Sequence, residues 1–318
     1  LAAAAAVVEQ LLESMKRHRP GAPESPRFSL KAMAPSALTT LNDSLGQGEV
    51  SAVVGFDIDP RALDAALARG IIDECAGSAA DAVESADLVL VATPVGAMRQ
   101  AFAAIAGPLP ARAIVTDVGS TKGSVIADAR AALGDAFLTS AMSARLPAHP
   151  IAGKEMPGVE HAEAGLFRGR RAVITPAAET DSSAAATIER LFAAAGARTE
   201  RMDAAEHDRI FAAVSHLPHL LSYALVAAIG AGPEGSRSLG YGGAGFRDFT
   251  RIAASSPVMW RDICVANRQA LGQQLRRYRE MLDRLQRAVD DGDAASLQQV
   301  FEQASALRRQ WTGAGDVR

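Results

Sequence analysis

Between Ser51 and about Met202 the chain alternates short apolar runs with stretches of helical spacing, and this alternation limits its possible folds more than any other feature. The apolar runs are continuous rather than alternating, as in parallel strands that are buried on both faces. They are Val53–Phe56, Leu88–Ala92, Ala113–Val115 and Ala172–Ile174. Strands of this kind, separated by helices, predict a doubly wound α/β domain with a parallel sheet.

After about Met202 no further strand is predicted, and helical spacing continues to the end of the chain. One apolar seam, with alternating steps of four and three residues, consists of Leu271, Leu275, Tyr278, Leu282, Leu285 and Val289. A last helix repeats the spacing with Leu297, Phe301, Ala304, Leu307 and Trp311. Such a seam forms either an intrachain helical core or an interface with a second copy of the chain, and the spacing does not separate the two.

The chain is therefore divided into three parts. Residues 1–27 are expected to form an N-terminal extension or linker, with a short amphipathic helix over Ala2–Arg17 followed by closely spaced prolines. Residues 28–202 form the α/β domain, and residues 203–318 form an all-helical C-terminal domain. The composition suits this division, because 318 residues that are 48% hydrophobic and 22% charged are typical of a globular chain of about two domains.

Charge and cysteine usage exclude several classes of protein. The 33 Lys and Arg against 36 Asp and Glu give a net charge of −3 with no basic cluster, so nucleic-acid binding is not expected. The apolar start Leu1–Val8 is too short for a membrane span and lacks the basic residues of a signal peptide. Cys75 and Cys264 match neither a metal motif nor a disulfide framework. We expect a cytoplasmic protein without a metal.

Ligands of open α/β sheets bind beyond the carboxyl ends of the strands, so the residues there are the first candidates for a site. Asp57 follows one predicted strand, and Thr93 and Pro94 follow another. An acid at Asp57 can accept hydrogen bonds from the ribose hydroxyls of NAD and repel the phosphate of NADP, although it could also simply cap the next helix. Ser120 lies in Asp-Val-Gly-Ser-Thr-Lys, between a predicted strand and a predicted helix. The small residues of this segment would let a ligand approach the backbone closely, although the segment could also be an ordinary helix N-cap.

Three later segments carry further candidates. His149 begins His-Pro-Ile-Ala-Gly-Lys-Glu, which we expect to be a loop, although a lone histidine is more often structural. His216 and His219 lie three residues apart near the start of a predicted helix, and they lack the additional ligands that a metal requires. The segment 242–251 is predicted to be a glycine-rich loop whose arginines can bind a carboxylate with two hydrogen bonds.

Taken in order, these segments resemble the prephenate/arogenate (cyclohexadienyl) dehydrogenase family, over roughly Ala52 to Asp262. The resemblance implies a Rossmann-like doubly wound domain that binds NAD, followed by an all-helical dimerisation domain, and hence a homodimer. It also implies a reaction of tyrosine biosynthesis, in which prephenate passes hydride to NAD, loses its ring carboxylate and becomes 4-hydroxyphenylpyruvate. Some members are inhibited by tyrosine in the same pocket.

The resemblance also implies a role for individual residues. His149 matches the catalytic histidine, which polarises or deprotonates the substrate hydroxyl, and Ser120 matches the serine that orients it near the nicotinamide. Arg251 matches an arginine that binds a substrate carboxylate, because prephenate is a dianion. The complete set predicted for the substrate is His219, Arg251, Glu155 and Trp260. The set predicted for the cofactor is Asp57, Thr93, Pro94 and Ser120.

One expected motif is absent. The family carries Gly-x-Gly-x-x-Gly before the strand-end acid, but Phe28–Leu45 contains no glycine, and Pro35 is expected to interrupt any strand there. Without these glycines, backbone amides cannot closely approach a pyrophosphate. Three explanations remain: an erroneous or frameshifted sequence in this region, a degenerate loop that binds NAD weakly, or a non-catalytic ligand-binding relative. We favour the first, because the other segments are intact.

Two further alternatives concern specificity and family. An arogenate or dual-substrate enzyme would carry the same segments, because the substrates differ only in one side-chain amino or keto group. A β-hydroxyacid dehydrogenase has a similar two-domain layout but requires a catalytic lysine on the first long helix after the α/β domain. The present chain has Ser215–His219 there, so this alternative ranks last.

Overall fold

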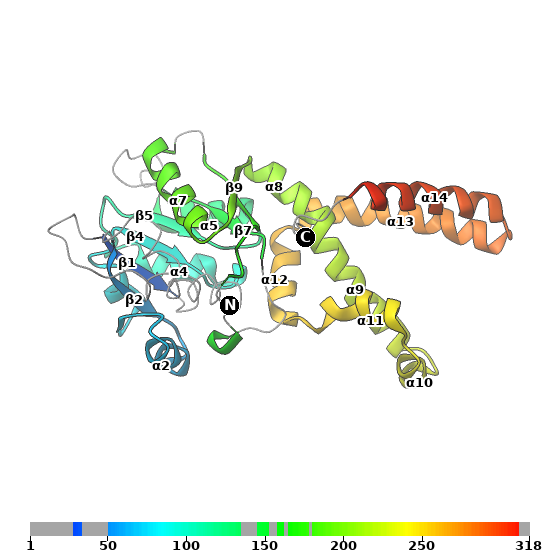
Figure 1. Ribbon diagram of the computed structural model, residues 1–318, viewed down its shortest axis with the longest axis horizontal. Helices are drawn as coiled ribbons and strands as arrows, with labels where there is room; N and C mark the ends of the chain where they lie inside the picture. The colour runs from blue at the N-terminus through cyan, green and yellow to red at the C-terminus, as the bar shows by residue number, and fades with distance from the viewer. Residues whose placement is uncertain are drawn as a thin grey trace.

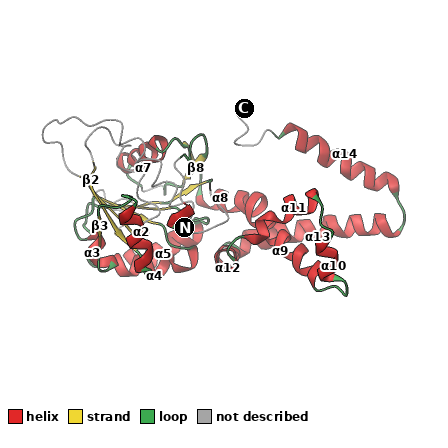
Figure 2. Cartoon of the chain, turned by 60° about the horizontal axis from the view of Figure 1, so that its bottom comes forward, coloured by secondary structure: helices red, strands yellow, loops and turns green. Residues whose placement is uncertain are grey.

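The computed structural model describes residues 28–33, 50–134, 145–152, 158–161, 165–177 and 180–311, and the structural statements below concern these residues. They form an α/β domain and a helical domain that extends away from it (Figure 1). Figure 2 shows the same division, with the strands confined to the first domain. The predicted extension 1–27, with its helix Ala2–Arg17, lies outside the described residues.

The α/β domain contains a six-stranded parallel sheet with the strand order β3-β2-β1-β4-β5-β6. Its strands are β1 (Phe28–Met33), β2 (Val50–Phe56), β3 (Glu74–Cys75), β4 (Leu88–Val91), β5 (Ile114–Asp117) and β6 (Arg145–Leu146). This is the order of a Rossmann fold, so the predicted doubly wound architecture is confirmed. Strand β1, which the sequence did not predict, ends at Met33. Pro35 lies outside the described residues, so the expectation that it interrupts a strand stays a prediction.

The central strand β4 shows why the apolar runs are continuous. Leu88 and Leu90 enter the hydrophobic cluster on one face of the sheet, and Val89 and Val91 enter the cluster on the other face. The first cluster includes buried residues of α2 (Pro60–Ala68) and α7 (Ser182–Ala194), and the second those of α3 (Ala79–Val83), α4 (Met98–Ile105) and α5 (Gly123–Leu133). Helices thus cover both faces of the sheet.

A second, three-stranded sheet follows in the order β7-β8-β9. Its strands are β7 (Ala148–Pro150), which is antiparallel to β8 (Arg171–Ile174), and β9 (Arg198–Arg201). The predicted strand Ala172–Ile174 is present, but it belongs to this smaller sheet. His149 lies in β7 and pairs with Val173, so the expectation of a loop there was wrong. Three residues that include a proline are too few to form a recognisable strand pattern.

A buried ion pair connects the two sheets. The ammonium group of Lys122 lies 2.5 Å from Oδ1 of Asp117, at the end of β5, and 2.5 Å from the carbonyl oxygen of Ala148, at the start of β7. Oδ1 of Asp117 also accepts the backbone N–H of Gly119. Both charged side chains are almost completely buried. The charge of Lys122 is therefore balanced inside the protein, and the same ammonium group holds β7 against the larger sheet.

The helical domain begins with one continuous helix made of α8 (Ala204–Phe211), a π-helical turn (Ala212–His216) and α9 (Leu217–Gly230). The remaining helices are α10 (Gly235–Gly240), α11 (Ala244–Thr250), α12 (Pro257–Ala266), α13 (Arg268–Asp290) and α14 (Ala294–Gln310). The predicted glycine-rich loop is therefore mostly helix, and Arg251 begins the short 3₁₀ turn that follows α11. The hydroxyl of Ser222 on α9 donates to the carbonyl of Phe249, which holds this segment against α9.

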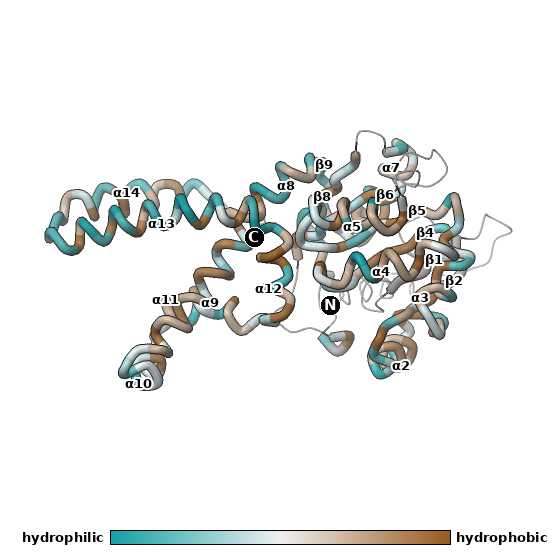
Figure 3. Tube along the Cα trace, turned by 180° about the vertical axis from the view of Figure 1, so that it is seen from behind, coloured by the Kyte–Doolittle hydropathy of each residue, from teal (hydrophilic) through white to brown (hydrophobic). Residues whose placement is uncertain are grey.

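Much of the apolar surface of the helical domain is exposed. Helices α13 and α14 form a hairpin that projects from the molecule, and apolar segments recur along it and along α9 (Figure 3). In the predicted seam, Leu271 is buried, but Val289, Phe301 and Leu307 keep more than half of their surface exposed. The continuous helix Ala204–Gly230 is also long and apolar enough to span a membrane by length and composition alone. An intrachain core does not account for these exposed residues.

The buried ion pair generates a prediction. Lys122→Met should lower the free energy of unfolding by about 3–5 kcal/mol, because it leaves the carboxylate of Asp117 buried without its cation. Urea unfolding followed by circular dichroism would measure the change. The control Arg112→Met removes a 3.4 Å pair with Asp87 whose arginine is 78% exposed, and it should leave the midpoint unchanged. Equal midpoints for Lys122→Met and the wild type would contradict the prediction.

Candidate functional site

A chain of hydrogen bonds runs through two histidines where the two domains meet. Nδ1 of His149, on β7, lies 2.8 Å from Nε2 of His207, on α8. Nδ1 of His207 lies 2.9 Å from Oδ1 of Asp208. His207 is fully buried and His149 is half-buried, so His149 is the member of the chain that a ligand can reach.

The carboxylate of Asp208 also caps a helix of the other domain. Its two oxygens accept the backbone N–H groups of Lys122 and Gly123, at 2.8 and 2.9 Å, where α5 begins. Lys122, the N-cap residue of α5, makes no side-chain capping hydrogen bond of its own. The amides at a helix N-terminus lack intrahelical partners and carry a partial positive charge, so they favour an ionised carboxylate. Asp208 thus connects the helical domain to the loop that contains Ser120.

Asn267, between α12 and α13, hydrogen-bonds to the backbone of Asp208 and to His216. Its side-chain amide donates to the backbone carbonyl of Asp208 at 2.8 Å and to Nδ1 of His216 at 3.0 Å. The backbone of Ser120 lies beside His216. The π-helical turn that ends at His216 therefore brings two separate helical elements and a strand-end loop to one place.

A second group of residues lies next to the histidine chain. The ring of His219 stacks on the indole of Trp260, with centroids 3.5 Å apart and planes at 17°, and His216 meets the same indole edge-on at 6.3 Å. Trp260 packs in a small cluster with Ile263 and Val95. Because Val95 directly follows Pro94, this cluster joins α12 to the carboxyl end of β4.

Unpaired polar atoms gather around these two groups. Among the residues that the structure describes, four buried side-chain atoms have no hydrogen bond of normal geometry. They are Thr93 Oγ1, Asp117 Oδ2, His216 Nε2 and Trp260 Nε1. Buried polar atoms are nearly always paired, so such a concentration indicates a place where a ligand or water supplies the missing partners. Two of the atoms follow or end parallel strands and two lie on the facing helices, which is where a ligand of this fold binds.

The structure places the predicted residues as follows. It brings His149, His219 and Trp260 to the junction of the domains, with the Ser120 loop and the Thr93–Pro94 segment beside them. Arg251 is exposed at the 3₁₀ turn packed against α9, the helix that bears His219. Glu155 lies outside the described residues.

Asp57 occupies the carboxyl end of β2. The helix cap that the sequence left open as an alternative is supplied by Asp59, which accepts the N–H of Arg61 at the start of α2. Asp57 instead accepts the N–H of Asp59 at 2.9 Å. Burial raises the pKa of the Asp57 carboxyl, against the effect of that hydrogen bond. The capping role is thus filled without Asp57, which remains available to a ligand at the strand end.

The sequence missed four residues of this site. Lys122 ends the segment that contains Ser120, but the sequence predicted no function for it. His207, Asp208 and Asn267 were not among the predicted site residues. The adjacent His-Asp pair near the start of a helix was the only available signal for His207 and Asp208. Within the described ranges, no group of three or more His, Cys, Asp or Glu could hold a metal ion.

Burial keeps the histidines neutral. The pKa of His149 lies well below its usual value because of burial, and the neighbouring His207, Lys122 and His216 lower it further. Burial lowers the pKa of His216 to about 4. It also lowers that of His207, against the opposing hydrogen bond from Asp208. Burial alone would raise the pKa of Asp208, but the His207 ring and the two backbone amides hold it below its usual value. At neutral pH the hydrogen-bonded chain therefore consists of two neutral rings, His149 and His207, and the ionised carboxylate of Asp208.

A Rossmann sheet joined to a helical domain, with a neutral histidine and unpaired polar atoms where they meet, defines an oxidoreductase of the two-domain dehydrogenase class. Residues 46–201 match the family model of the prephenate dehydrogenase nucleotide-binding domain, and residues 203–303 match that of the prephenate dehydrogenase dimerization domain. The chain belongs to the prephenate dehydrogenase family, as the sequence segments predicted.

Individual relatives agree with this assignment. The chain is 35% identical to the cyclohexadienyl dehydrogenase of Zymomonas mobilis over 77% of this chain and 82% of that protein. It is 31% identical to the prephenate dehydrogenase of Bacillus subtilis over 80% of this chain and 68% of that one. A crystal structure of the Aquifex aeolicus prephenate dehydrogenase with hydroxyphenyl propionate and NAD+ superposes with a TM-score of 0.78 at 30% identity, covering 91% and 99% of the two chains.

The depressed pKa of His216 makes stability depend on pH. Unfolded His216 binds a proton below about pH 6.5, whereas the folded residue does so only near pH 4, so stability falls as the pH is lowered between these values. The loss reaches roughly 3 kcal/mol at the low end. His216→Asn keeps an acceptor for Asn267 but cannot titrate, so its urea midpoint should fall less steeply over this range. Parallel profiles for the variant and the wild type would contradict the prediction.

Proposed function

We propose that this protein is an NAD-dependent prephenate dehydrogenase. Prephenate would pass the hydride from its hydroxyl-bearing ring carbon to NAD and its hydroxyl proton to a base. The ring carboxylate would leave as carbon dioxide, its bonding electrons would enter the ring, and the ring oxygen would take a proton back, which gives aromatic 4-hydroxyphenylpyruvate and NADH. The observation that carries the proposal is the half-buried, neutral His149 at the junction of a Rossmann sheet and a helical domain. The family and the names of its relatives support the substrate.

Each residue of the site then has a chemical role. His149 accepts the hydroxyl proton as hydride leaves, which requires the neutral imidazole that burial provides. Ser120, in the loop capped by Asp208, orients the hydroxyl and the imidazole. Arg251 would bind a carboxylate of the dianionic substrate, and the stacked rings of His219 and Trp260 would contact the substrate. Glu155 is proposed to control access to the site, from the family resemblance alone.

The residues at the strand ends suit a dinucleotide. The strand order reverses between β1 and β4, and ligands of this fold bind at that point. Asp57 would accept hydrogen bonds from the adenine ribose, and Thr93, Pro94 and Ser120 would line the path toward the nicotinamide. Thr93 supplies a buried hydroxyl oxygen that has no hydrogen-bond partner within the described ranges. When bound, NAD supplies the hydride acceptor.

The substrate preference has one competing form. The relative from Zymomonas mobilis is a cyclohexadienyl dehydrogenase, and a crystal structure of Synechocystis arogenate dehydrogenase shares the fold at 23% identity with a TM-score of 0.72. An enzyme that accepts arogenate, or both substrates, would use the same histidine and the same hydride transfer. Comparison of kcat/KM on prephenate and on arogenate distinguishes the two forms.

We further propose a homodimer formed by the helical domain, with domain boundaries at residues 28–202 and 203–318 and a cytoplasmic location. The dimerization-domain match and the exposed seam support the homodimer.

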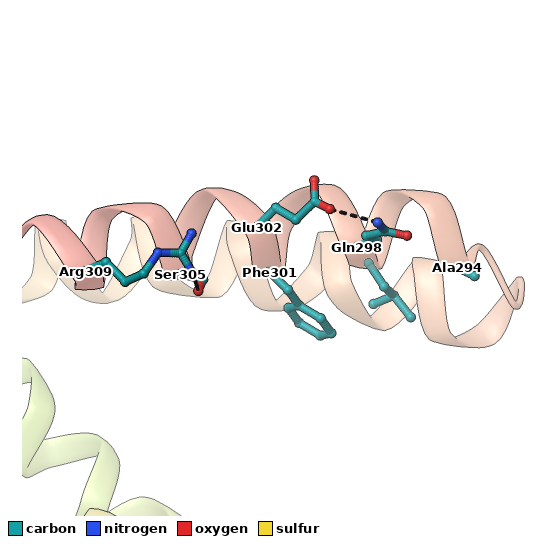
Figure 4. Close-up of a pocket in the computed structure, with 7 residues that line it drawn as sticks. Ala294, Gln298, Phe301, Glu302, Ser305 and Arg309 are labelled. Atoms are coloured by element: carbon teal, nitrogen blue, oxygen red, sulfur yellow. Dashed lines mark hydrogen bonds between the residues drawn. The ribbon is translucent and has the colours of Figure 1, made fainter.

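Helix α14 also carries an open groove of ≈ 500 Å³, lined by Ala294, Leu297, Gln298, Phe301, Glu302, Ser305 and Arg309. Figure 4 shows the Phe301 ring projecting on the opposite side from the hydrogen-bonded Gln298 and Glu302. A second copy would cover this apolar side.

The activity is tested by NADH formation when prephenate is added to the protein with NAD. His149→Asn should lower kcat by about 10²–10⁴-fold, because the variant lacks the base that accepts the hydroxyl proton. The control His161→Asn changes a histidine in the turn Val159–His161 that packs on α2, and it should retain the wild-type rate. Absence of NADH from the wild type with prephenate and with arogenate would refute the proposed function. Addition of tyrosine to the same assay tests whether it competes with the substrate.

The dimer is tested by light scattering during size-exclusion chromatography. Phe301→Glu places a charge in the exposed seam and should convert the dimer to a monomer, because an unpaired charge is costly to bury at an interface. The control Gln303→Glu lies about 200° away around the same helix and should leave the mass of a dimer. A wild-type monomer, or a dimer with Phe301→Glu, would contradict the proposal.

A further inference from the structure

We propose that His207 and Asp208 are positioning residues that fix which nitrogen of His149 carries the proton, so that its Nε2 is always the free base. This inference rests on the proposed function for its consequence in catalysis, but the arrangement itself follows from the hydrogen bonds of the folded protein.

The carboxylate of Asp208 determines the direction of each hydrogen bond in the chain His149–His207–Asp208. The carboxylate of Asp208 is ionised and can only accept, and two of its hydrogen bonds come from backbone N–H groups, at Lys122 and Gly123. Nδ1 of His207 therefore carries a proton and donates it to Oδ1 of Asp208. A neutral His207 then has a bare Nε2, which can only accept from Nδ1 of His149. A neutral His149 with its proton on Nδ1 has a lone pair on Nε2.

The opposite arrangement is costly. A proton on Nε2 of His149 would leave its Nδ1 bare, and two lone pairs would then face each other across 2.8 Å at His207. Reversal of the whole chain would require a protonated Asp208, which the amides at the start of α5 oppose. Ring rotation is also restricted, because Phe211 packs against both imidazoles, with centroids 4.9 and 4.4 Å away.

The chain also stabilises the charge that the reaction creates. As the ring carbon loses hydride to NAD, the hydroxyl proton moves to Nε2 of His149, which becomes an imidazolium. Its Nδ1–H remains bonded to His207, whose far side is bonded to the carboxylate of Asp208. When the ring carboxylate leaves as carbon dioxide, its electron pair enters the ring and the ring oxygen takes the proton back from Nε2, which restores the same tautomer. His207 and Asp208 never touch the substrate in this scheme.

Two substitutions of His207 separate this role from packing. His207→Gln places an amide oxygen near the former Nε2 and can still accept from Nδ1 of His149, whereas His207→Leu fills similar space without an acceptor. We expect His207→Leu to lower kcat by about 10–100-fold, as the loss of an orienting partner does elsewhere, with the KM values for prephenate and NAD little changed. His207→Gln should restore most of the lost rate. Equal losses in the two variants would overturn the proposal.

A second measurement does not require activity. Nitrogen-15 spectra of the histidine-labelled protein distinguish a protonated from a bare ring nitrogen, and the His149→Asn variant assigns the signals of His149. In the wild type, Nε2 should appear bare and Nδ1 protonated at neutral pH, and His207→Leu should give a mixture of the two tautomers. A wild-type spectrum with a protonated Nε2 would refute the inference. If the wild type fails to oxidise either substrate, the proposed function fails, but these spectra still decide the tautomer.

Discussion

The arrangement of the site depends on one carboxylate that belongs to one domain and neutralises the start of a helix in the other. Asp208 is carried by α8, yet its oxygens satisfy the first amides of α5 as well as the ring of His207. Without it, the N–H groups at the start of α5 and the buried imidazole of His207 would lose their acceptor together. Asp208 is connected to His149 through His207, so docking of the two domains also brings His149 its hydrogen-bond partner.

The positive charge of Lys122 complements this arrangement. Its ammonium group is neutralised by Asp117, yet it still lies near enough to His149 to lower the pKa of that ring. A buried cation beside a base is unfavourable for proton uptake, so the resting imidazole stays neutral over a wide pH range. By holding the carbonyl of Ala148, the same group also fixes the backbone from which His149 projects. Lys122 thus affects both the position and the charge state of this histidine.

Sequence patterns predicted the parts of the molecule that local periodicity determines. The parallel strands were predictable because β4 is buried on both faces, and the helical domain was predictable because its apolar seam repeats over two helices. Resemblance to a family singled out His149, His219 and Trp260, which the structure places at the junction of the domains. The positioning residues were missed because their partners are distant along the chain: Asp208 lies 86 residues from Lys122, and Asn267 lies 59 from Asp208. Strand β7 was missed because it has only three residues, and α11 because its preceding glycines are typical of a loop.

The π-helical turn Ala212–His216 has a consequence for how proteins of this kind can change. The turn contains one residue more than an α-helical path requires, between the half of the helix that carries Asp208 and the half that carries His219. Deletion of that residue would rotate α9 by about 100° relative to α8. The His219 ring would leave the face of Trp260, and the exposed side of α9 would turn in a new direction. Insertions and deletions within this turn therefore change the position of His219 and the direction of the outer surface of α9 together.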